Sequence, residues 1–284
     1  MANWAGFQKY KTIKTIEKFW LHMALLLGLL FTIAPFVWMV STSFKPGGGI
    51  FSYPPKWFPD HPTLEWYRQL FKDVDFLLHF KNSLIVSITT TFFNLFFCSL
   101  AGYAFAKLRF LGRDKIFTLL MATLMVPGQI TMIPVFLFLK QLGLLNSYWG
   151  LILPASVGIF GIFLVRQFMM TIPDDLIEAA RIDGCSEFRI YWNVILPLCK
   201  PVLATLGIFT FMGSWNDFLW PLIVMIGEER YTLPVALANL SGQFATKFGL
   251  LMAGAVVVVM PIILIFVFAQ KYVIRGIATT GLKE

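Results

Sequence analysis

The group of residues best suited to a defined task is a charged, helix-favouring segment from Glu178 to Pro201, in a chain that is otherwise strongly apolar. Leu176 to Asp183 holds residues of high helix propensity, and Gly184 stands where a glycine can end a helix in the left-handed conformation. Ser186 can cap a second short helix, which we expect to end at Pro197. Two short amphipathic helices at a membrane surface can receive force from a soluble partner, which is a mechanical task rather than a catalytic one.

The predicted surface of this helix pair suits close contact with another protein. Ala179, Ala180 and Gly184 are small enough for a partner to approach the backbone. An apolar ridge runs beside the charged residues and consists of Leu176, Ile177, Ala180, Phe188, Tyr191 and Trp192. The pattern alone fits equally well a surface hairpin that only connects two membrane spans.

A second group of candidates lies in the apolar stretches themselves. Asp217 is the only charged residue well inside one of them, and a central Asp costs roughly 2.5–3.5 kcal/mol to insert into a membrane. Such residues usually face a bundle interior or a wet cavity. We therefore predict a cavity for a hydroxyl-rich solute, with candidate residues Asn216, Asp217, Trp215, Asn94 and Gln129. The same residues also fit hydrogen bonding between helices and anchoring of tryptophan at the membrane interface.

Chemical machinery of other kinds is missing from the sequence. No G-x-x-x-x-G-K-[ST] phosphate-binding loop occurs, so the chain has no recognisable ATPase of its own. Cys98, Cys185 and Cys199 have neither paired nor metal-like spacing. We expect no metal, no cofactor and no catalytic nucleophile in this chain.

The composition indicates that most of the chain lies in lipid. Of 284 residues, 58% are hydrophobic and 13% are charged, with a mean hydropathy of +0.74. A soluble domain of this size could not bury so much apolar surface.

Six stretches are long enough to cross a bilayer core, which needs roughly 20 apolar residues in a helix. They are Phe19–Thr42, Ser83–Ala106, Ile116–Leu139, Trp149–Phe168, Val202–Ile226 and Leu250–Val273. Prolines within them permit kinks: Pro35, Pro127, Pro134, Pro154, Pro221 and Pro261.

The basic residues predict the orientation. Lysine and arginine are denser in the loops on the side that holds both termini, the loop Lys107–Lys115 and the segment Arg166–Lys200, which includes the loop 171–200. By the positive-inside rule these parts lie in the cytoplasm. We therefore expect an all-α membrane protein with a cytoplasmic segment 1–18, a six-span transmembrane domain 19–275 and a cytoplasmic tail 276–284.

The segment from Glu178 to Pro197 resembles the EAA loop of ATP-binding-cassette importer permeases. That pattern reads EAA, three residues, G, nine residues, I-x-L-P, and the spacing is met here, with Val194 in place of isoleucine and Cys185 in place of a common alanine. Further stretches resemble the maltose-type carbohydrate-uptake branch of the family, and the resemblance covers essentially the whole chain. These stretches are Pro35–Met39 with Ser43–Pro46, Trp215–Pro221 and Gly276–Glu284.

The resemblance implies a coupling helix that docks in a groove of an ATPase and transmits closure of the ATPase dimer to the membrane helices. The ATPase-coupling residues would be Glu178, Ala179, Ala180, Asp183, Gly184, Leu196 and Pro197. In the maltose-type system the C-terminal tail of the smaller permease also reaches the ATPase, and that resemblance points to Thr280, Gly281 and Leu282.

The resemblance also implies the partners and the place of work. It predicts a heterodimer with a second homologous permease, an ABC ATPase dimer that binds ATP and Mg²⁺, and an extracytoplasmic solute-binding protein, in the lipid of a bacterial plasma or inner membrane and without nucleic acid. The cargo is then a sugar or oligosaccharide, with a polyol, glycerol phosphate or uronate oligomer left open. The alternative is an ATP-independent secondary carrier or channel for small polar solutes, which would not explain the cytoplasmic insert. An intramembrane enzyme would need a catalytic pair that the spans lack.

Overall fold

The computed structural model describes residues 4–243 and 247–281, and the side chains within 17–72, 74–243 and 247–268. The regular elements of this described part are all helical, and no strand occurs in it, as the sequence predicts. The helices form two compact units, one from residues 1–73 with 244–257 and the other from residues 74–243 with 258–284.

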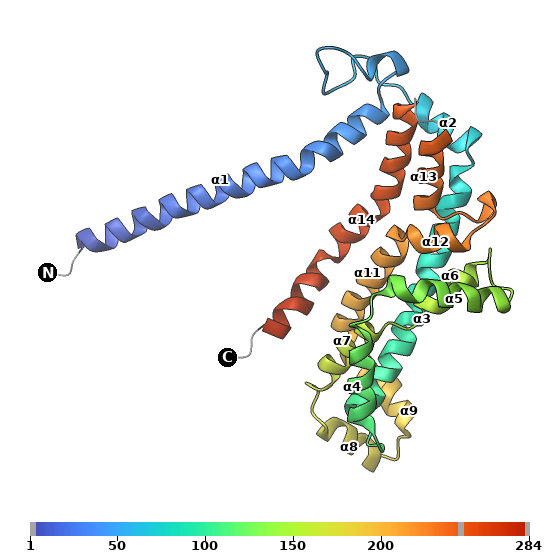
Figure 1. Cartoon of the computed structure of the whole chain (residues 1–284). Helices are drawn as coiled ribbons and strands as arrows, with labels where there is room; N and C mark the ends of the chain where they lie inside the picture. Colours follow the sequence, from blue (N-terminus) through green and yellow to red (C-terminus); the bar gives the residue numbers. More distant parts are fainter. Residues whose placement is uncertain (1–3, 244–246, 282–284) are drawn as a thin grey trace. The chain divides into compact units, whose positions relative to one another are not determined.

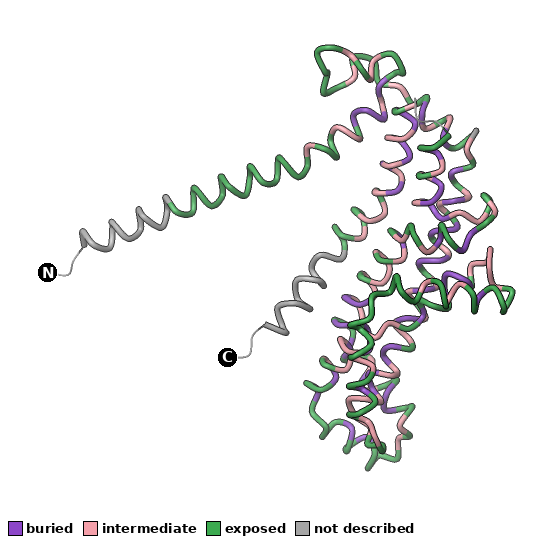
Figure 2. The backbone as a smooth tube through the Cα atoms, viewed as in Figure 1, coloured by how far each residue is buried: buried purple, intermediate pink, exposed green. Residues whose placement is uncertain are grey.

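The first unit contains a long apolar helix followed by a folded loop. α1 (Trp4–Ser43) includes a candidate membrane span, Glu17–Ser43, whose most apolar window has no buried residue (Figure 2). The loop contains η1 (Gly47–Gly49) and leads to α2 (Glu65–Asp73), and α14 (Phe248–Gly281) begins in the same unit. Because this window of α1 is apolar and exposed, lipid or a partner must surround it.

The loop between α1 and α2 is held by a buried lysine. Lys45 Nζ donates a hydrogen bond to the backbone oxygen of Lys56 at 2.7 Å and lies 4.0 Å from the ring centre of Trp38. Trp66 Nε1 donates to the backbone oxygen of Lys45 at 2.7 Å. Burial lowers the pKa of Lys45, and the cation–π contact and the carbonyl compensate for its lost hydration.

The core of the second unit is built on α3 (Phe76–Lys107), α7 (Ile159–Met169) and α11 (Lys200–Asn216), which lie side by side (Figure 1). Gly102 permits the close approach of α3 to α7, since a Cβ at that position would lie 2.9 Å from Cγ1 of Val165. The unit is completed by α4 (Arg113–Thr123), α5 (Gly128–Gln141), α6 (Tyr148–Ala155), α8 (Asp175–Ile182), α9 (Glu187–Ile190), η2 (Tyr191–Ile195), α10 (Leu196–Leu198), α12 (Leu219–Val224), η3 (Glu228–Arg230) and α13 (Leu233–Gln243).

Within the described residues, three helices are long and apolar enough to cross a membrane: Glu17–Ser43, Phe76–Lys107 and Phe248–Phe268. Three more candidates are pairs of helices with a bend between them. The bend is 99° between α4 and α5, 41° between α6 and α7, and 80° between the helix Glu187–Leu198 and α11. The count reaches six only if each bent pair is one span, so the six-span topology stays a prediction.

Three of the predicted spans are broken rather than continuous. Trp149–Phe168 is divided between α6 and α7, which are bent by 41°. Ile116–Leu139 is divided between α4 and α5, because Pro127 lacks an N–H and disfavours helical geometry at the residue before it. Val202–Ile226 is divided at Asp217, whose backbone is extended with φ −66 and ψ 124. Hydropathy reports how long an apolar stretch is, but it does not report such a change of direction.

Candidate functional site

The predicted helix pair is present, and it lies at the end of the second unit where α3 ends (Figure 1). Its turn has the predicted glycine geometry, with Gly184 at φ +77. The N–H of Cys185 donates to the backbone oxygen of Ala180 at 3.0 Å, and that of Gly184 to the oxygen of Arg181 at 3.0 Å. These two bonds form a Schellman motif, which satisfies the last carbonyls of α8 and fixes where the chain reverses.

The second helix of the pair differs in two details from the prediction. Ser186 stands at the N-cap with extended geometry, but its side chain makes no capping hydrogen bond. The helix also continues through Pro197 to Leu198 and widens into a π turn at Tyr191–Ile195. Pro197 lies in the first turn of α10, directly after the π turn.

The helix pair has a buried inner face and an exposed outer face. Ile177, Ala180, Ile190 and Ile195 belong to the apolar core shared with α3 and α7. Of the seven predicted coupling residues, those exposed to solvent are Glu178, Ala179, Asp183, Gly184 and Pro197, while Leu196 is half-buried and Ala180 is buried. Ala180 therefore anchors α8 to the bundle instead of facing outward.

The predicted apolar ridge is not one surface. Ile177, Ala180 and Tyr191 are buried against the bundle, whereas the other three members are exposed: Leu176, Phe188 and Trp192. The ring planes of Phe188 and Trp192 lie nearly parallel, with centres 6.3 Å apart, on the outer side of the second helix. The sequence could not separate these two groups, because the partner helices that cover the first group are distant in the chain.

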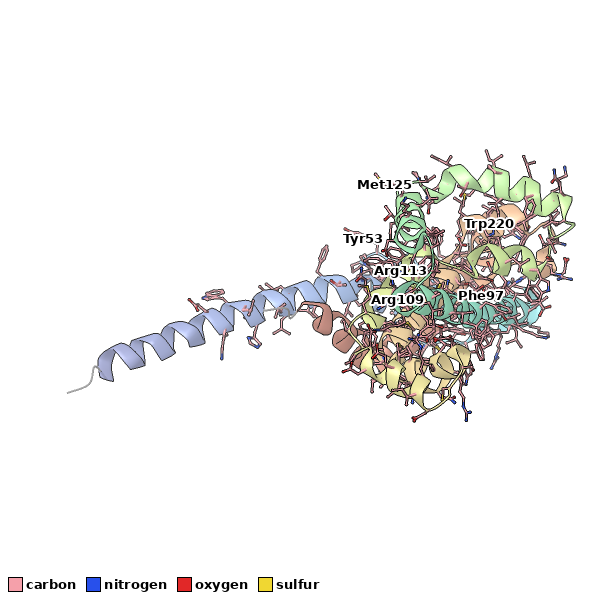
Figure 3. The ribbon with its side chains drawn as sticks, turned by 90° about the horizontal axis from the view of Figure 1, so that it is seen from below. Tyr53, Phe97, Arg109, Arg113, Met125 and Trp220 are labelled. Atoms are coloured by element: carbon pink, nitrogen blue, oxygen red, sulfur yellow. The ribbon has the colours of Figure 1, made fainter. Side chains whose placement is uncertain are left out.

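An ion pair fixes the start of α8. Lys107 Nζ, at the end of α3, donates to Asp174 Oδ1 at 2.6 Å and to the backbone oxygen of Ile172 at 2.6 Å. The lysine side chain is buried while the aspartate is largely exposed. Hydrogen bonding and charge from Lys107 lower the pKa of Asp174. The next basic residues, Arg109 and Arg113, mark the loop that joins α3 to α4 (Figure 3).

Asp217 lines a cavity of about 160 Å³ in the second unit. The other polar lining residues are Thr90, Thr210 and Ser214, and Trp220 (labelled in Figure 3) forms part of the wall. Asp217 Oδ1 accepts a long hydrogen bond from the backbone N–H of Trp220 at 3.4 Å. The buried hydroxyl of Thr90 has no hydrogen-bond partner among the described residues. The cavity thus contains hydrogen-bonding capacity that its own walls do not use.

The structure brings only part of the predicted cavity set together. Asn94 does not line the cavity itself, but its Oδ1 accepts a hydrogen bond at 3.3 Å from the hydroxyl of Thr210, which does. Trp215 is fully buried and donates from Nε1 to the backbone oxygen of Val258 at 3.0 Å, so it packs the bundle instead of lining the cavity.

Asn216 and Gln129 are also absent from the cavity lining. Asn216 is exposed and bonds to the backbone oxygen of Met212 in its own helix, and Gln129 is exposed on α5. Thr90, Thr210 and Ser214 were missed, because hydroxyl residues in apolar helices usually bond to their own backbone and carry no distinct signal.

An all-helical protein with apolar helices long enough to cross a membrane and an exposed helix pair at one end is consistent with a membrane transport permease. Residues 79–279 match the family described as binding-protein-dependent transport system inner membrane component. The chain belongs to this family.

Several relatives are named as permeases of carbohydrate transport systems. The arabinooligosaccharides transport system permease protein AraQ of Bacillus subtilis is 41% identical over 204 residues, which cover 72% of this chain and 73% of the relative. The galactooligosaccharides transport system permease protein GanQ of the same species is 34% identical, covering 88% and 90%. In a solved bacterial ABC transporter involved in the import of the acidic polysaccharide alginate, one chain is similar with a TM-score of 0.81 and 26% identity, covering 91% of this chain and 97% of that one.

Proposed function

We propose that this chain is the translocation subunit of an ATP-driven importer for a sugar or oligosaccharide. Relatives named for arabino- and galacto-oligosaccharides, and a similar chain in an alginate importer, support this class of cargo. The proposed partners are a second homologous permease, an ATPase dimer that binds ATP and Mg²⁺, and an extracytoplasmic solute-binding protein. Both termini lie in the cytoplasm in this proposal, as the positions of the basic residues predict.

The division of α8 into two faces carries the proposal. Ile177 and Ala180 fix the helix to the bundle, while Glu178, Ala179 and Asp183 point away from it, next to the Gly184 turn. A partner groove can therefore accept the outer face without separating the inner face from the core. A displacement of the docked helix would then move the membrane helices, which is what a coupling helix requires.

The cavity at Asp217 supports a direct role in cargo binding. An ionised carboxylate accepts hydrogen bonds from hydroxyl groups, and the hydroxyl of Thr90 can donate or accept. A carbohydrate hydroxyl in the cavity would use both groups, and its ring could lie against Trp220. We propose that Asp217 and Thr90 contact the cargo and that Asn94 orients the Thr210 hydroxyl beside it.

The C-terminal contact with the ATPase also stays a proposal. Thr280 and Gly281 lie in α14, but their side chains are outside the described residues, as is Leu282 altogether. The support for a role of these three residues is the resemblance of the tail to that of the carbohydrate branch.

Purification of the tagged chain from its native host in mild detergent tests the assembly. Mass spectrometry should find an ATPase, a second permease and a binding protein in fixed ratio, and a parallel preparation from cells with the untagged chain identifies background proteins. The binding protein can then be titrated with arabinotriose, galactotriose and alginate oligomers. A chain that comes out alone, or only with copies of itself, would replace the importer by the carrier or channel alternative.

A further inference from the structure

Three polar side chains form a buried stripe along the last turns of α3. Ser99, Tyr103 and Lys107 follow one another at a spacing of four residues, so they lie on one face of the helix. Ser99 is 1% exposed, Tyr103 is 3% exposed and the side chain of Lys107 is 4% exposed. Burying polar groups costs free energy unless each one has a partner, so the positions of the partners are informative.

The outer two members of the stripe bind the helix pair at two places. Lys107 bonds Asp174 at the start of α8, as described above. Tyr103 donates from its hydroxyl to Glu187 Oε2, at the start of α9, at 2.8 Å. The other oxygen of Glu187 accepts from Nε of Arg181, in the last turn of α8, at 2.7 Å. One face of α3 therefore holds α8 at both of its ends, the second end through the carboxylate of Glu187.

The innermost member of the stripe meets the helix pair where the second helix widens. The hydroxyls of Ser99 and Tyr191 are 2.8 Å apart, and Tyr191 opens the π turn. The rings of Tyr103 and Tyr191 lie 5.5 Å apart between centres. Glu187 and Tyr191 have the same four-residue spacing as Tyr103 and Ser99, so the two helices meet along matched polar pairs.

We propose that Ser99, Tyr103 and Lys107 are positioning residues that transmit the displacement of α8 to α3. This inference rests on the proposed coupling function of α8. Apolar contacts between helices permit sliding, whereas directional hydrogen bonds to one helix face resist it. α3 also carries Thr90 to the cavity, about 26 Å along the helix from Lys107 at 1.5 Å per residue. A displacement of α8 would therefore move α3 and, with it, Thr90 in the wall of the cavity.

Loss of the stripe has a specific consequence under this proposal. The outer face of α8 is unchanged, so the ATPase still docks and still hydrolyses ATP. The movement that reaches α3 is smaller, so less cargo crosses per ATP. A role in folding alone would instead reduce the yield of the complex, or hydrolysis and uptake together.

The test uses the complete complex in proteoliposomes, with ATP hydrolysis and arabinotriose uptake measured on the same sample. Tyr103→Phe combined with Ser99→Ala removes two hydroxyls and keeps the rings. We expect normal complex yield, at least half of the wild-type hydrolysis and at least a fivefold lower ratio of sugar to ATP. Glu187→Gln keeps an acceptor for Tyr103 and should show an intermediate ratio. Tyr148→Phe is the matched control, since Tyr148 loses a shorter hydroxyl bond, 2.6 Å to Asn82 Oδ1, away from the helix pair.

An unchanged ratio in the double variant overturns the proposal, and so does an equal fall of hydrolysis and uptake. Should the double variant give no complex, Ser99→Ala alone decides, because it removes a single oxygen atom and leaves the ring contacts in place. Failure of the proposed function is distinguishable from failure of this proposal, because the wild-type preparation would then contain no ATPase.

Discussion

Replacement of Gly184 by aspartate should leave the permease folded but should uncouple ATP hydrolysis from uptake. Gly184 has φ +77, a conformation that costs a residue with a Cβ roughly 1–2 kcal/mol, and aspartate tolerates it better than most residues. A Cβ at this position meets no atom within 4 Å, so packing adds no further strain. Burial of Ile177 and Ile190 contributes roughly 1.5–3 kcal/mol each, which keeps the helix pair attached to the bundle.

The loss of function should arise at the partner. In the proposed complex the turn enters an ATPase groove, and the substitution adds both bulk and a negative charge there, beside the exposed carboxylate of Asp183. A loss of about 1.4 kcal/mol in docking is a factor of ten in affinity. We therefore expect ATP-driven uptake below a tenth of the wild-type rate, with wild-type membrane insertion and a melting temperature close to that of the wild type.

Gly143→Asp is the matched control for this experiment. Gly143 has φ +68, also with no atom within 4 Å of a Cβ, but it follows α5 and lies outside the helix pair. The backbone cost is therefore similar and the docking surface is unchanged. Yield, thermal unfolding, ATP hydrolysis and arabinotriose uptake are measured for both variants in proteoliposomes. Normal uptake by Gly184→Asp, or an equal loss of uptake in Gly143→Asp, would refute the reasoning.

Three further predictions concern other parts of the chain. Asp217→Asn removes the carboxylate of the cavity and should lower uptake at least tenfold with basal hydrolysis retained; unaltered uptake would assign Asp217 to helix packing. Lys107→Ala leaves the Ile172 carbonyl without its buried donor and should destabilise the unit by about 1–3 kcal/mol in thermal unfolding, whereas Lys115→Ala, at an exposed position of α4, should not. Deletion of Gly281–Glu284 should weaken assembly or ATPase coupling, and unchanged complex yield with unchanged hydrolysis would contradict a role of the tail.

The helix pair could be predicted in detail because its signals are local. Helix propensity, the left-handed glycine and the capping pattern act over a few residues, so α8 and the Gly184 turn follow from the sequence between Asp175 and Cys185. The apolar stretches could be predicted for a similar reason, since length and hydropathy set what a bilayer accepts. α8 and the Gly184 turn lie within a few residues of the prediction, whereas three of the six predicted spans are divided into shorter helices.

The contacts between distant segments could not be predicted in the same way. Ser99, Tyr103 and Lys107 have regular spacing, but a single serine and tyrosine in an apolar span carry no signal until the residues opposite them are known. Their partners lie 67 to 92 residues further along the chain. Trp215 is an example of a wrong prediction from residue type. A tryptophan near Asp217 suggests a sugar cavity, but the indole N–H of Trp215 donates to the backbone oxygen of Val258 and the residue packs in the bundle.

The break between α4 and α5 gives a physical reason for a second permease. At this turn of 99° the N–H groups of Leu124, Met125 and Val126 bond to carbonyls of the preceding turn, but Pro127 has no N–H with which to continue the helical ladder. Leu124, Met125 and Val126 at this break are exposed, Met125 to 86%. Irregular backbone within the hydrocarbon layer occurs only where protein or a water-filled cavity covers it, since lipid offers no hydrogen bonds. If α4 and α5 form one span, this exposed break must face a neighbouring subunit or an aqueous pathway, and a heterodimer that shares one translocation pathway between two permeases supplies both.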